Sequence, residues 1–135
     1  MSAQRGPSAE IAGSVSTVDD ARDSEFVVTV SREEGAVVVA VRGELDAAST
    51  PEMQLRLAAE AGAGGPLVLD LLECEFVDST GLHAIIDTRA AVEESGGRFA
   101  VACTPDGAVA RVIAVALPGM LDTHASRAAA LAAVA

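Results

Sequence analysis

The chain has 135 residues, half of them apolar, which is the size of one domain with enough apolar side chains for a core. Nine basic residues, all of them Arg, against 20 acidic residues give a net charge of −11, which disfavours nucleic acid and anionic membrane surfaces and favours a monomer. Two Cys are too few for a disulfide framework. The sequence has neither an apolar run of membrane-spanning length nor a basic leader, so we expect a cytoplasmic protein.

The N-terminal segment differs in character from the rest of the chain. Residues 1–24 are small and polar without a sustained period, so we expect a disordered tail before one domain over 25–135. Two β-branched runs, 26–30 and 36–41, flank a short turn with a glycine, which is typical of a hairpin. The second run is apolar on both faces, as in a strand that is covered on both sides.

A first helix is predicted after this hairpin. Thr50 is expected to cap it, Pro51 to occupy its first position and the glycine-rich run 62–65 to end it. The stripe expected on its inner face consists of Leu55, Ala58, Ala59 and Gly62.

A short buried strand is predicted at 67–71, followed by a loop that holds Cys74 and Phe76. A second helix is then expected from Ser79 to about Ser95, where two glycines end it. Its apolar stripe consists of Leu82, Ile85, Ile86 and Ala90.

The last third of the sequence continues the alternation of strands and helices. A strand at 99–103 precedes a third helix with Thr104 as cap and Pro105 at its first position. Its expected inward residues are Val109, Val112, Ile113 and Ala116. A short strand at 120–121 and a final Ala-rich helix capped by Ser126 complete the chain. This order predicts an α/β fold with a largely parallel sheet of four or five strands and about four helices.

Metal and thiol chemistry find little support in the sequence. His83 and His124 are far apart and belong to no metal-binding spacing, so each is expected at the surface or its boundary. Cys74 and Cys103 are expected to act as small hydrophobes, which suits the strand position of Cys103 better than the loop position of Cys74. We therefore expect no metal and no cofactor.

Nucleophilic catalysis is also disfavoured. Ser79 follows a loop and opens a helix, but the surrounding residues 77–81 do not match the G-x-S-x-G elbow. A base would have to be His124 or His83, and His83 lies on the same helix as Ser79. The glycine-rich run 62–65 lacks the lysine of a phosphate-binding loop. An enzyme is therefore not expected.

The sequence DSTGL at 78–82 allows two interpretations. In the first, Asp78 or Ser79 only caps the helix by accepting hydrogen bonds from the amides of its first turn. In the second, Ser79 accepts a phosphate, which the helix dipole favours by about 0.3–1 kcal/mol and free amides can bind. A phosphate adds about −1.5 to −2 charges to a neutral position without disturbing the fold, which suits the switching of an interface.

The sequence VDSTGL at 77–82, after the apolar strand at 67–71, resembles the signature of STAS domains, and among them the bacterial anti-sigma factor antagonists. The similarity continues in GELD at 43–46 with Thr50 and Pro51, in GGRF at 96–99, and in LPGML at 117–121 before an Ala-rich helix. It covers residues 26–134, and DSTGL together with GELD is its specific part.

This resemblance implies partner switching. The unphosphorylated antagonist binds an anti-sigma factor, a serine kinase with a histidine-kinase-like ATPase fold, and thereby releases a sigma factor. The kinase then phosphorylates the antagonist, and a metal-dependent serine phosphatase restores it. Carried onto this chain, Ser79 is the phosphorylated residue, Thr80 is the second choice, and Asp46 and Asp78 lie at the rim of the same site. The implied partner-binding residues are Asp46, Asp78, Ser79, Thr80, Gly81, Leu82 and His83.

Other functions stay open beside this one. The chain departs from the family at His83, where many relatives have a small residue, and this difference could alter the choice of partner. A STAS subunit of a lipid-transport ATPase or of a stress-signalling complex would work without phosphorylation, although the intact sequence at 78–80 favours the switch. A hydrolase with Ser79 as nucleophile and a purely structural interaction domain are the remaining alternatives.

Overall fold

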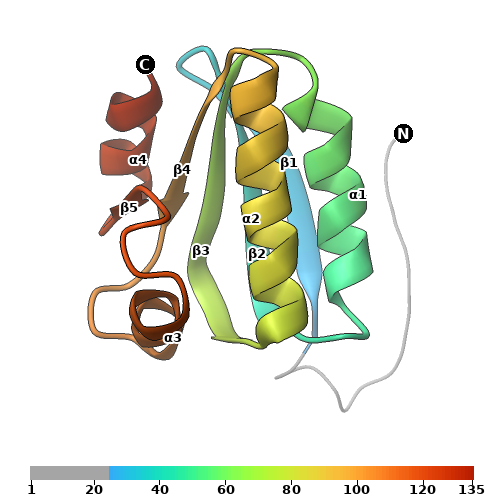
Figure 1. The fold of residues 1–135 in the computed structure, drawn as a ribbon, viewed down its shortest axis with the longest axis vertical. Coiled ribbons are helices and arrows are strands. Elements are labelled where there is room, and N and C mark those ends of the chain that lie inside the picture. Colours follow the sequence, from blue (N-terminus) through green and yellow to red (C-terminus); the bar gives the residue numbers. More distant parts are fainter. Residues whose placement is uncertain (1–24) are drawn as a thin grey trace.

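A five-stranded sheet lies at the centre of the computed structural model, which describes residues 25–135 (Figure 1). The strands are β1 (Val27–Glu33), β2 (Ala36–Leu45), β3 (Pro66–Val77), β4 (Arg98–Ala102) and β5 (Thr123–His124). The helices are α1 (Thr50–Ala61), α2 (Ser79–Glu94), α3 (Ala108–Ala116) and α4 (Arg127–Val134). The sheet order is β1-β2-β3-β4-β5, with only β1 antiparallel to its neighbour, which confirms the predicted fold class. The tail expected at 1–24 lies outside the described residues.

A tight turn closes the predicted hairpin between β1 and β2. Glu34 and Gly35 have φ angles of 51° and 82°, and two successive positive values are the mark of a type I′ turn. The pairing runs from Val27 opposite Arg42 to the residues that flank the turn. The turn is shorter than the sequence indicated, and β2 continues past the predicted end at 41 to Leu45.

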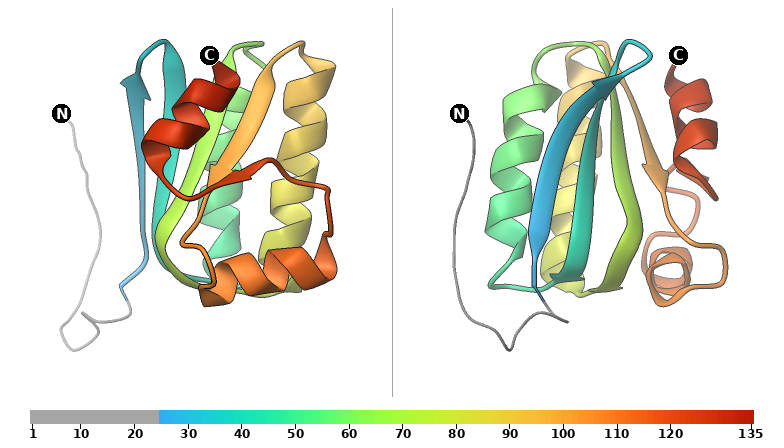
Figure 2. Two further views of the ribbon diagram at one scale, coloured as in Figure 1. Left: turned by 90° about the vertical axis from the view of Figure 1, so that its left-hand side faces the viewer. Right: turned by 180° about the vertical axis from the view of Figure 1, so that it is seen from behind.

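The two faces of the sheet carry different layers. The strands after the hairpin add in sequence order, and right-handed crossovers of this kind place α1 and α2 on one face. The helix α4 covers β3 and β4 on the opposite face (Figure 2). Alternation along β2 divides the core accordingly, with Val39 packed towards α1 and α2 and Val38 towards α4. Val109 and Ile113 of α3 join the larger cluster, on the side of α1 and α2.

The inner face of α1 differs from the prediction. The helix is capped by Ser49, so Thr50 is its first residue and Pro51 its second. The buried side chains are Thr50, Met53, Leu57 and Ala61, whereas Leu55 is 72% exposed. Leu55 is two positions from both Met53 and Leu57, which places it on the far side of a helix with 3.6 residues per turn.

The predicted loop at 72–76 is a strand, because β3 continues through Cys74 and Phe76 to Val77. Register shifts interrupt its pairing with β2, and β4 accompanies it only as far as Asp70. In α2 the predicted bounds are nearly correct, since the helix ends at Glu94. Its buried residues are Gly81, Leu82, Ala84, Ile85, Thr88 and Val92, so the predicted stripe is wrong at Ile86, which is half-buried, and at Ala90, which is exposed.

The C-terminal third differs from the prediction at the start of α3, at two of its inward residues and at the last strand. Residues 104–107 form a turn in which the amide of Gly107 donates to the carbonyl of Thr104 at 3.0 Å, so α3 begins at Ala108. Val109 and Ile113 are buried as predicted, whereas Val112 is half-buried and Ala116 is exposed. The last strand is β5 rather than residues 120–121. The cap of α4 is confirmed, because the Ser126 hydroxyl accepts a hydrogen bond from the amide of Ala129 at 3.1 Å.

Candidate functional site

The predicted site lies where two neighbouring parallel strands end. Leu45 at the end of β2 is in register with Val77 at the end of β3, so Asp46 and Asp78 follow at the same edge of the sheet. The amide of Asp78 donates to the carbonyl of Leu45 at 3.0 Å, which joins the two strand ends. The structure thus brings together the two segments that the sequence singled out, 43–46 and 77–82.

Asp78 caps the helix that carries the two hydroxyl residues. Its backbone is extended, and its Oδ1 accepts a hydrogen bond from the amide of Gly81 at 3.2 Å. Ser79 and Thr80 are therefore the first two residues of α2, and both are exposed. Amides in the first turn of a helix have no acceptor within the helix and point towards any group bound there. The hydroxyl of Ser79 thus lies at a helix end that is open to a protein partner and favourable to a negative charge.

Gly81 allows the start of α2 to lie directly on the strand ends. A Cβ at this position would come 2.7 Å from Cγ2 of Val77 and 3.1 Å from Cβ of Leu45. Leu82, the next residue, is 7% exposed and belongs to the core cluster. Gly81 and Leu82 therefore pack the start of α2 against the strand ends and the core.

Asp46 organises the turn that leads into α1. Its Oδ1 accepts hydrogen bonds from the amides of Ala48 and Ser49 and from the Ser49 hydroxyl, each at 3.0 Å. These bonds, first of all the one from the backbone of Ser49, lower the pKa of the Asp46 carboxyl below its usual value. The Asp46 carboxylate thus holds the turn before α1 in place, at the edge of the sheet where the resemblance placed it.

Ser49 is a residue of this edge that the sequence reasoning did not identify. Its single hydroxyl proton is shared between the carbonyl of Glu44 at 2.6 Å and Oδ1 of Asp46 at 3.0 Å, and the hydroxyl oxygen accepts from the amide of Asp46 at 3.0 Å. An aspartate followed three residues later by a serine, directly before a helix with an early proline, was the available signal. Within residues 25–135, the buried hydroxyl of Thr50 has no hydrogen-bond partner, and it lies 3.6 Å from the position that a Cβ on Gly81 would take.

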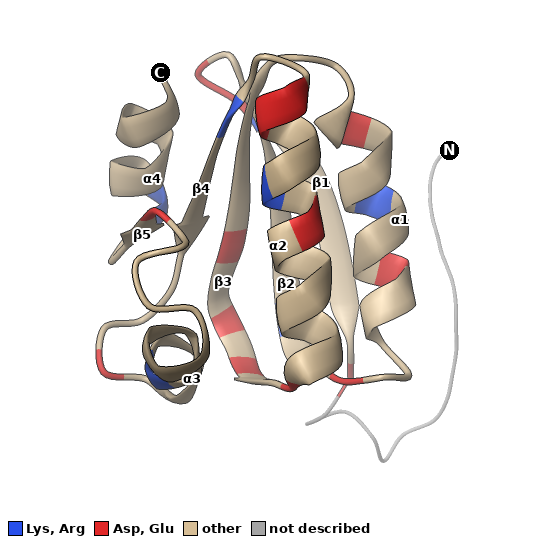
Figure 3. Cartoon of the chain, viewed as in Figure 1, with Lys and Arg blue, Asp and Glu red and all other residues tan. Residues whose placement is uncertain are grey.

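The residues around Ser79 combine an uncharged helix end with an acidic edge. Acidic residues lie along the lower part of β3 and in the loop before α1, whereas the first two turns of α2 contain no Asp, Glu, Lys or Arg (Figure 3). Of the predicted partner-binding residues, Ser79, Thr80 and His83 are exposed, and Asp46 and Asp78 are half-buried. His83 is four positions after Ser79 and so lies on the same side of the helix. The surface open to a partner is thus one helix face beside carboxylates.

In the described part of the chain, Asp78 and His124 each lie beside another polar group. No group of three or more His, Cys, Asp and Glu side chains within residues 25–135 is placed to hold a metal ion. Asp78, the carboxylate next to Ser79, is engaged with the amide of Gly81. His124 is half-buried on β5, where its Nε2 lies 2.9 Å from Oδ1 of Asp122. None of the helices over residues 25–135 has the length and apolar character needed to cross a membrane.

Both cysteines are buried, as expected of small hydrophobes, although Cys74 lies in a strand and not in the predicted loop. Cys74 lies within β3 and is 8% exposed, and Cys103 follows β4 and is 4% exposed. Burial raises the pKa of both thiols, so each is a poorer nucleophile than a cysteine at the surface.

Comparison with known proteins identifies the family of the chain as that of STAS domains. A family model described as "Mlab, STAS domain" matches residues 28–121. The anti-sigma-B factor antagonist of Bacillus subtilis is 33% identical over 70 residues, which are 52% of this chain and 64% of that protein. The chain thus aligns with somewhat less than two thirds of this relative.

Solved structures agree with the family match. An anti-sigma factor antagonist from Mycobacterium paratuberculosis superposes with a TM-score of 0.73 at 24% identity, covering 82% of this chain and 95% of the other. The Bacillus cell fate determinant SpoIIAA in its phosphorylated form superposes with a TM-score of 0.62 at 19% identity, covering 82% of this chain and all of that one. At these identities the likeness concerns the fold.

Proposed function

Because the chain belongs to the STAS domain family, we propose that it is an anti-sigma factor antagonist that phosphorylation of Ser79 switches off. The observation that carries this proposal is the position of Ser79, exposed as the first residue of α2 beside the capping carboxylate of Asp78. Unphosphorylated, the protein would bind an anti-sigma factor and release a sigma factor. The antagonist named among its relatives supports this choice within the family.

The edge around Ser79 is suited to a reversible modification. A phosphate at the start of α2 would meet the free amides of the first turn and the positive end of the helix dipole, so the fold would tolerate it. Gly81 and Leu82 are buried beneath the helix start and would stay in place. The modification would therefore act on the surface and leave the core as it is.

The same phosphate would change binding through its charge. It adds about −1.5 to −2 charges beside the carboxylates of Asp46 and Asp78, at an edge that is already acidic. A partner adapted to the neutral hydroxyl would meet repulsion and a cost of desolvation. We expect a loss of about 1–3 kcal/mol, or roughly 5-fold to 150-fold in affinity, as in other coupled switches.

The remaining components of the proposal follow from partner switching. The binding partner would be an anti-sigma factor that is itself a serine kinase with a histidine-kinase-like ATPase fold. This kinase would phosphorylate Ser79, and a serine phosphatase would remove the phosphate. Thr80 is the second candidate for modification, because it is exposed at the next position. The chain itself would be a substrate and a binding partner.

The test uses three full-length baits, Ser79→Ala, Ser79→Asp and the control Thr80→Ala, in lysate of the native host. We expect Ser79→Ala and Thr80→Ala to retain an anti-sigma kinase that Ser79→Asp binds more weakly by roughly fivefold or more, in line with a charge penalty of about 1–3 kcal/mol. With the captured kinase and ATP, mass spectrometry should place phosphate on Ser79 in the wild-type chain and in Thr80→Ala. Equal capture by all three baits would contradict the charge switch.

A subunit role in a lipid-transport ATPase, which the resemblance to STAS domains also allows, is the second candidate. In that case the face around α2 would hold a stable partner and no phosphate would be needed. The same baits separate the two functions, because a transporter ATPase would be retained equally by Ser79→Ala and Ser79→Asp.

A further inference from the structure

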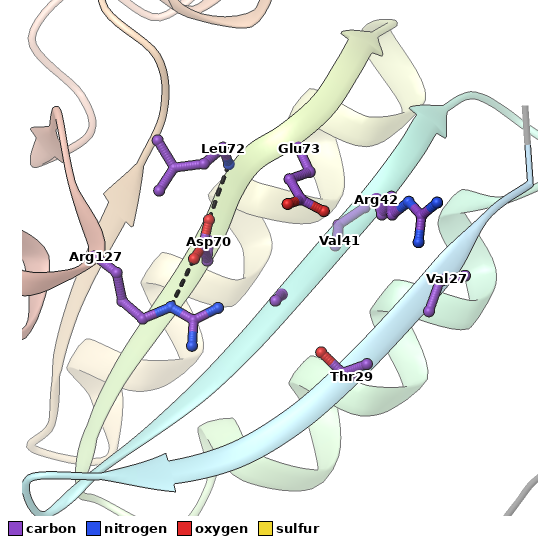
Figure 4. A pocket seen from close by; sticks show the side chains of 9 residues that line it. Val27, Thr29, Val41, Arg42, Asp70, Leu72, Glu73 and Arg127 are labelled. Carbon is purple, nitrogen blue, oxygen red and sulfur yellow. Dashed lines mark hydrogen bonds and ion pairs between the residues drawn. The ribbon is translucent and has the colours of Figure 1, made fainter. Parts of the chain in front are cut away.

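A hollow lies on the sheet face opposite α1 and α2. The helix α4 covers β3 and β4, and no helix of the described chain stands in front of β1 and β2 (Figure 2, right). The hollow measures about 450 Å³, within the range of ligand and peptide sites. Its lining holds the side chains of Val27, Thr29, Ala40 and Leu72, two arginines, Arg42 and Arg127, and two carboxylates, Asp70 and Glu73 (Figure 4). Apolar surface, two guanidinium groups and two carboxylates thus meet in one hollow.

The two arginines of the hollow have different surroundings. Arg127 is fixed, with its Nε 2.7 Å from Oδ2 of Asp70 and its Nη1 2.6 Å from Oε2 of Glu33. Arg42 is exposed and forms no ion pair with another residue of 25–135, although Glu73 is its register partner on β3. Arg42 is therefore the positive group of the hollow that is available to an occupant.

The chain enters the sheet beside Arg42. Val27 pairs with Arg42 at the start of β1 and lines the hollow itself. The preceding residues lie against β2, because a Cβ on Gly43 would lie 2.9 Å from the carbonyl oxygen of Glu25 and 3.2 Å from Cα of Phe26. Glu25, the first described residue, therefore lies next to the strand that carries Arg42.

The sequence before this point complements the unpaired Arg42 in charge and the apolar lining in polarity. Residues 15–24 read VSTVDDARDS, with three aspartates against one arginine and two valines further from the entry. Five extended residues span at most about 17 Å, so Asp20 and Asp23 can both reach Arg42 from position 25. We propose that residues 15–24 of this chain bind in the hollow, with aspartate facing Arg42 and the valines over the apolar surface of β1 and β2.

The competing surface within reach is the edge that carries Ser79. That edge presents Glu44, Asp46 and Asp78, and residues 43–50 and 77–83 contain no arginine. The carboxylates of the hollow, Asp70 and Glu73, lie beside Arg127 and Arg42, so the edge repels an acidic segment more strongly than the hollow does. The wider negative charge of the molecule matters less, because the Debye length is about 8 Å at physiological ionic strength. The segment therefore binds at Arg42 and leaves Ser79 free. The tether also makes the contact intramolecular, so that a weak contact suffices for occupancy.

A nitroxide at position 16 of the full chain, Ser16→Cys, tests the proposal by paramagnetic broadening of amide signals. The native thiols are buried and have raised pKa values, so the new cysteine reacts first. We expect Thr29, Ala40 and Leu72 to lose signal and α2 to keep it. Arg42→Gln should restore most of the lost signal. Arg32→Gln should not, since alternation along β1 places Arg32 on the face opposite Thr29.

Three outcomes would overturn the proposal. Broadening around Ser79 in place of the hollow would assign the segment to the other surface, and uniform weak broadening would mean no docking. A further sample mixes nitroxide-bearing protein with isotope-labelled protein that carries no nitroxide. If the amide signals of the hollow broaden in the labelled protein, the segment that fills the hollow comes from a second copy. As an internal check, the signal loss should be larger at an ionic strength of about 0.01 M than at about 1 M, where the Debye length is about 3 Å. None of these readouts depends on phosphorylation or on a sigma-factor pathway.

Discussion

Asp46 shows how one carboxylate sets the geometry of the candidate site. Three donors from Ala48 and Ser49 converge on its Oδ1, and the amide of Thr50 donates to its carbonyl at 2.9 Å. The turn before α1 is therefore held by a charged acceptor, and hydrogen bonds to a charged group are stronger than those between neutral groups. The family resemblance at 43–46 thus has a physical basis in this turn.

The lowered pKa of Asp46 predicts a pH dependence of stability. In the folded chain Asp46 stays ionised to lower pH than in the unfolded chain, so the unfolded state binds more protons between the two pKa values. The stabilisation is complete above the unfolded value, about 3.9, and is lost as the pH falls through the folded value. Urea unfolding should therefore show Asp46→Asn to be less stable than the wild type near pH 7, with a gap that closes as the pH approaches 2.

Ser49→Ala provides the matched control for this prediction. It removes one donor and leaves the carboxylate, so the double variant should lose less than the sum of the two single variants. A gap of constant size between pH 2 and pH 7 would show that the charge of Asp46 does not stabilise the turn.

At the scale of elements, the attachment of α2 to the strand ends depends on Gly81. An alanine within a helix normally gains up to about 1 kcal/mol over glycine. Here the added Cβ would lie 2.7 Å from the branched side chain of Val77, and overpacking of this kind costs about 1–3 kcal/mol. Overpacking should prevail, so we expect Gly81→Ala to lower the free energy of unfolding by about 1–2 kcal/mol, measured by urea denaturation.

Gly62 at the end of α1 is the control, because a Cβ there meets nothing within 4 Å and its φ is −80°. Gly62→Ala should be neutral or slightly stabilising. If Gly81→Ala proved as stable as the wild type, the close contact between α2 and the strand ends would not be required.

The elements that the sequence predicted well carry their signals locally. Three such signals are the turn glycine of the hairpin, the Asp78 cap and the glycines after α2. Each lies in a short segment and locates the end of a strand or helix to within a few residues. The inner face of α1 was missed because two stripes on that helix have helical spacing. One starts at Leu55 and continues in alanines, and the other consists of Met53, Leu57 and Ala61, which the structure buries.

The other errors also arise from context that a sequence does not show. The second half of β3 pairs with β2 but not with β4, so its exposed positions hold Glu73 and Glu75, which resemble a loop. Thr104 and Pro105 look like the start of a helix, but a turn with Asp106 at a φ of 61° delays the start of α3. The edge that joins 43–46 to 77–82 was expected from the resemblance, whereas the part played by Ser49 depends on a turn geometry that spacing alone does not fix.

At the scale of the whole molecule, Arg127 joins elements that are distant in sequence. It lies in the first turn of α4, where the helix dipole disfavours a cation, so its position reflects tertiary contacts. Its guanidinium contacts Asp70 in the centre of the sheet and Glu33 at the end of β1. Asp70 also accepts from the amide of Leu72 at 2.9 Å, so its buried carboxylate has a polar partner on each side. The first strand and the last helix are thereby fixed to one central group.

This arrangement predicts that Arg127→Ala destabilises the fold through the charge that it leaves behind. Removing one partner of a fully buried pair costs about 3–5 kcal/mol, and because Arg127 is 37% exposed we expect about 1–3 kcal/mol in urea unfolding. In an Asp70→Asn background the same substitution should cost less, since no buried charge remains. Arg89→Ala is the control: it breaks an exposed pair with Glu93 and should cost at most about 0.5 kcal/mol. An equal, small effect of both arginine substitutions would mean that α4 is held by its apolar contacts alone.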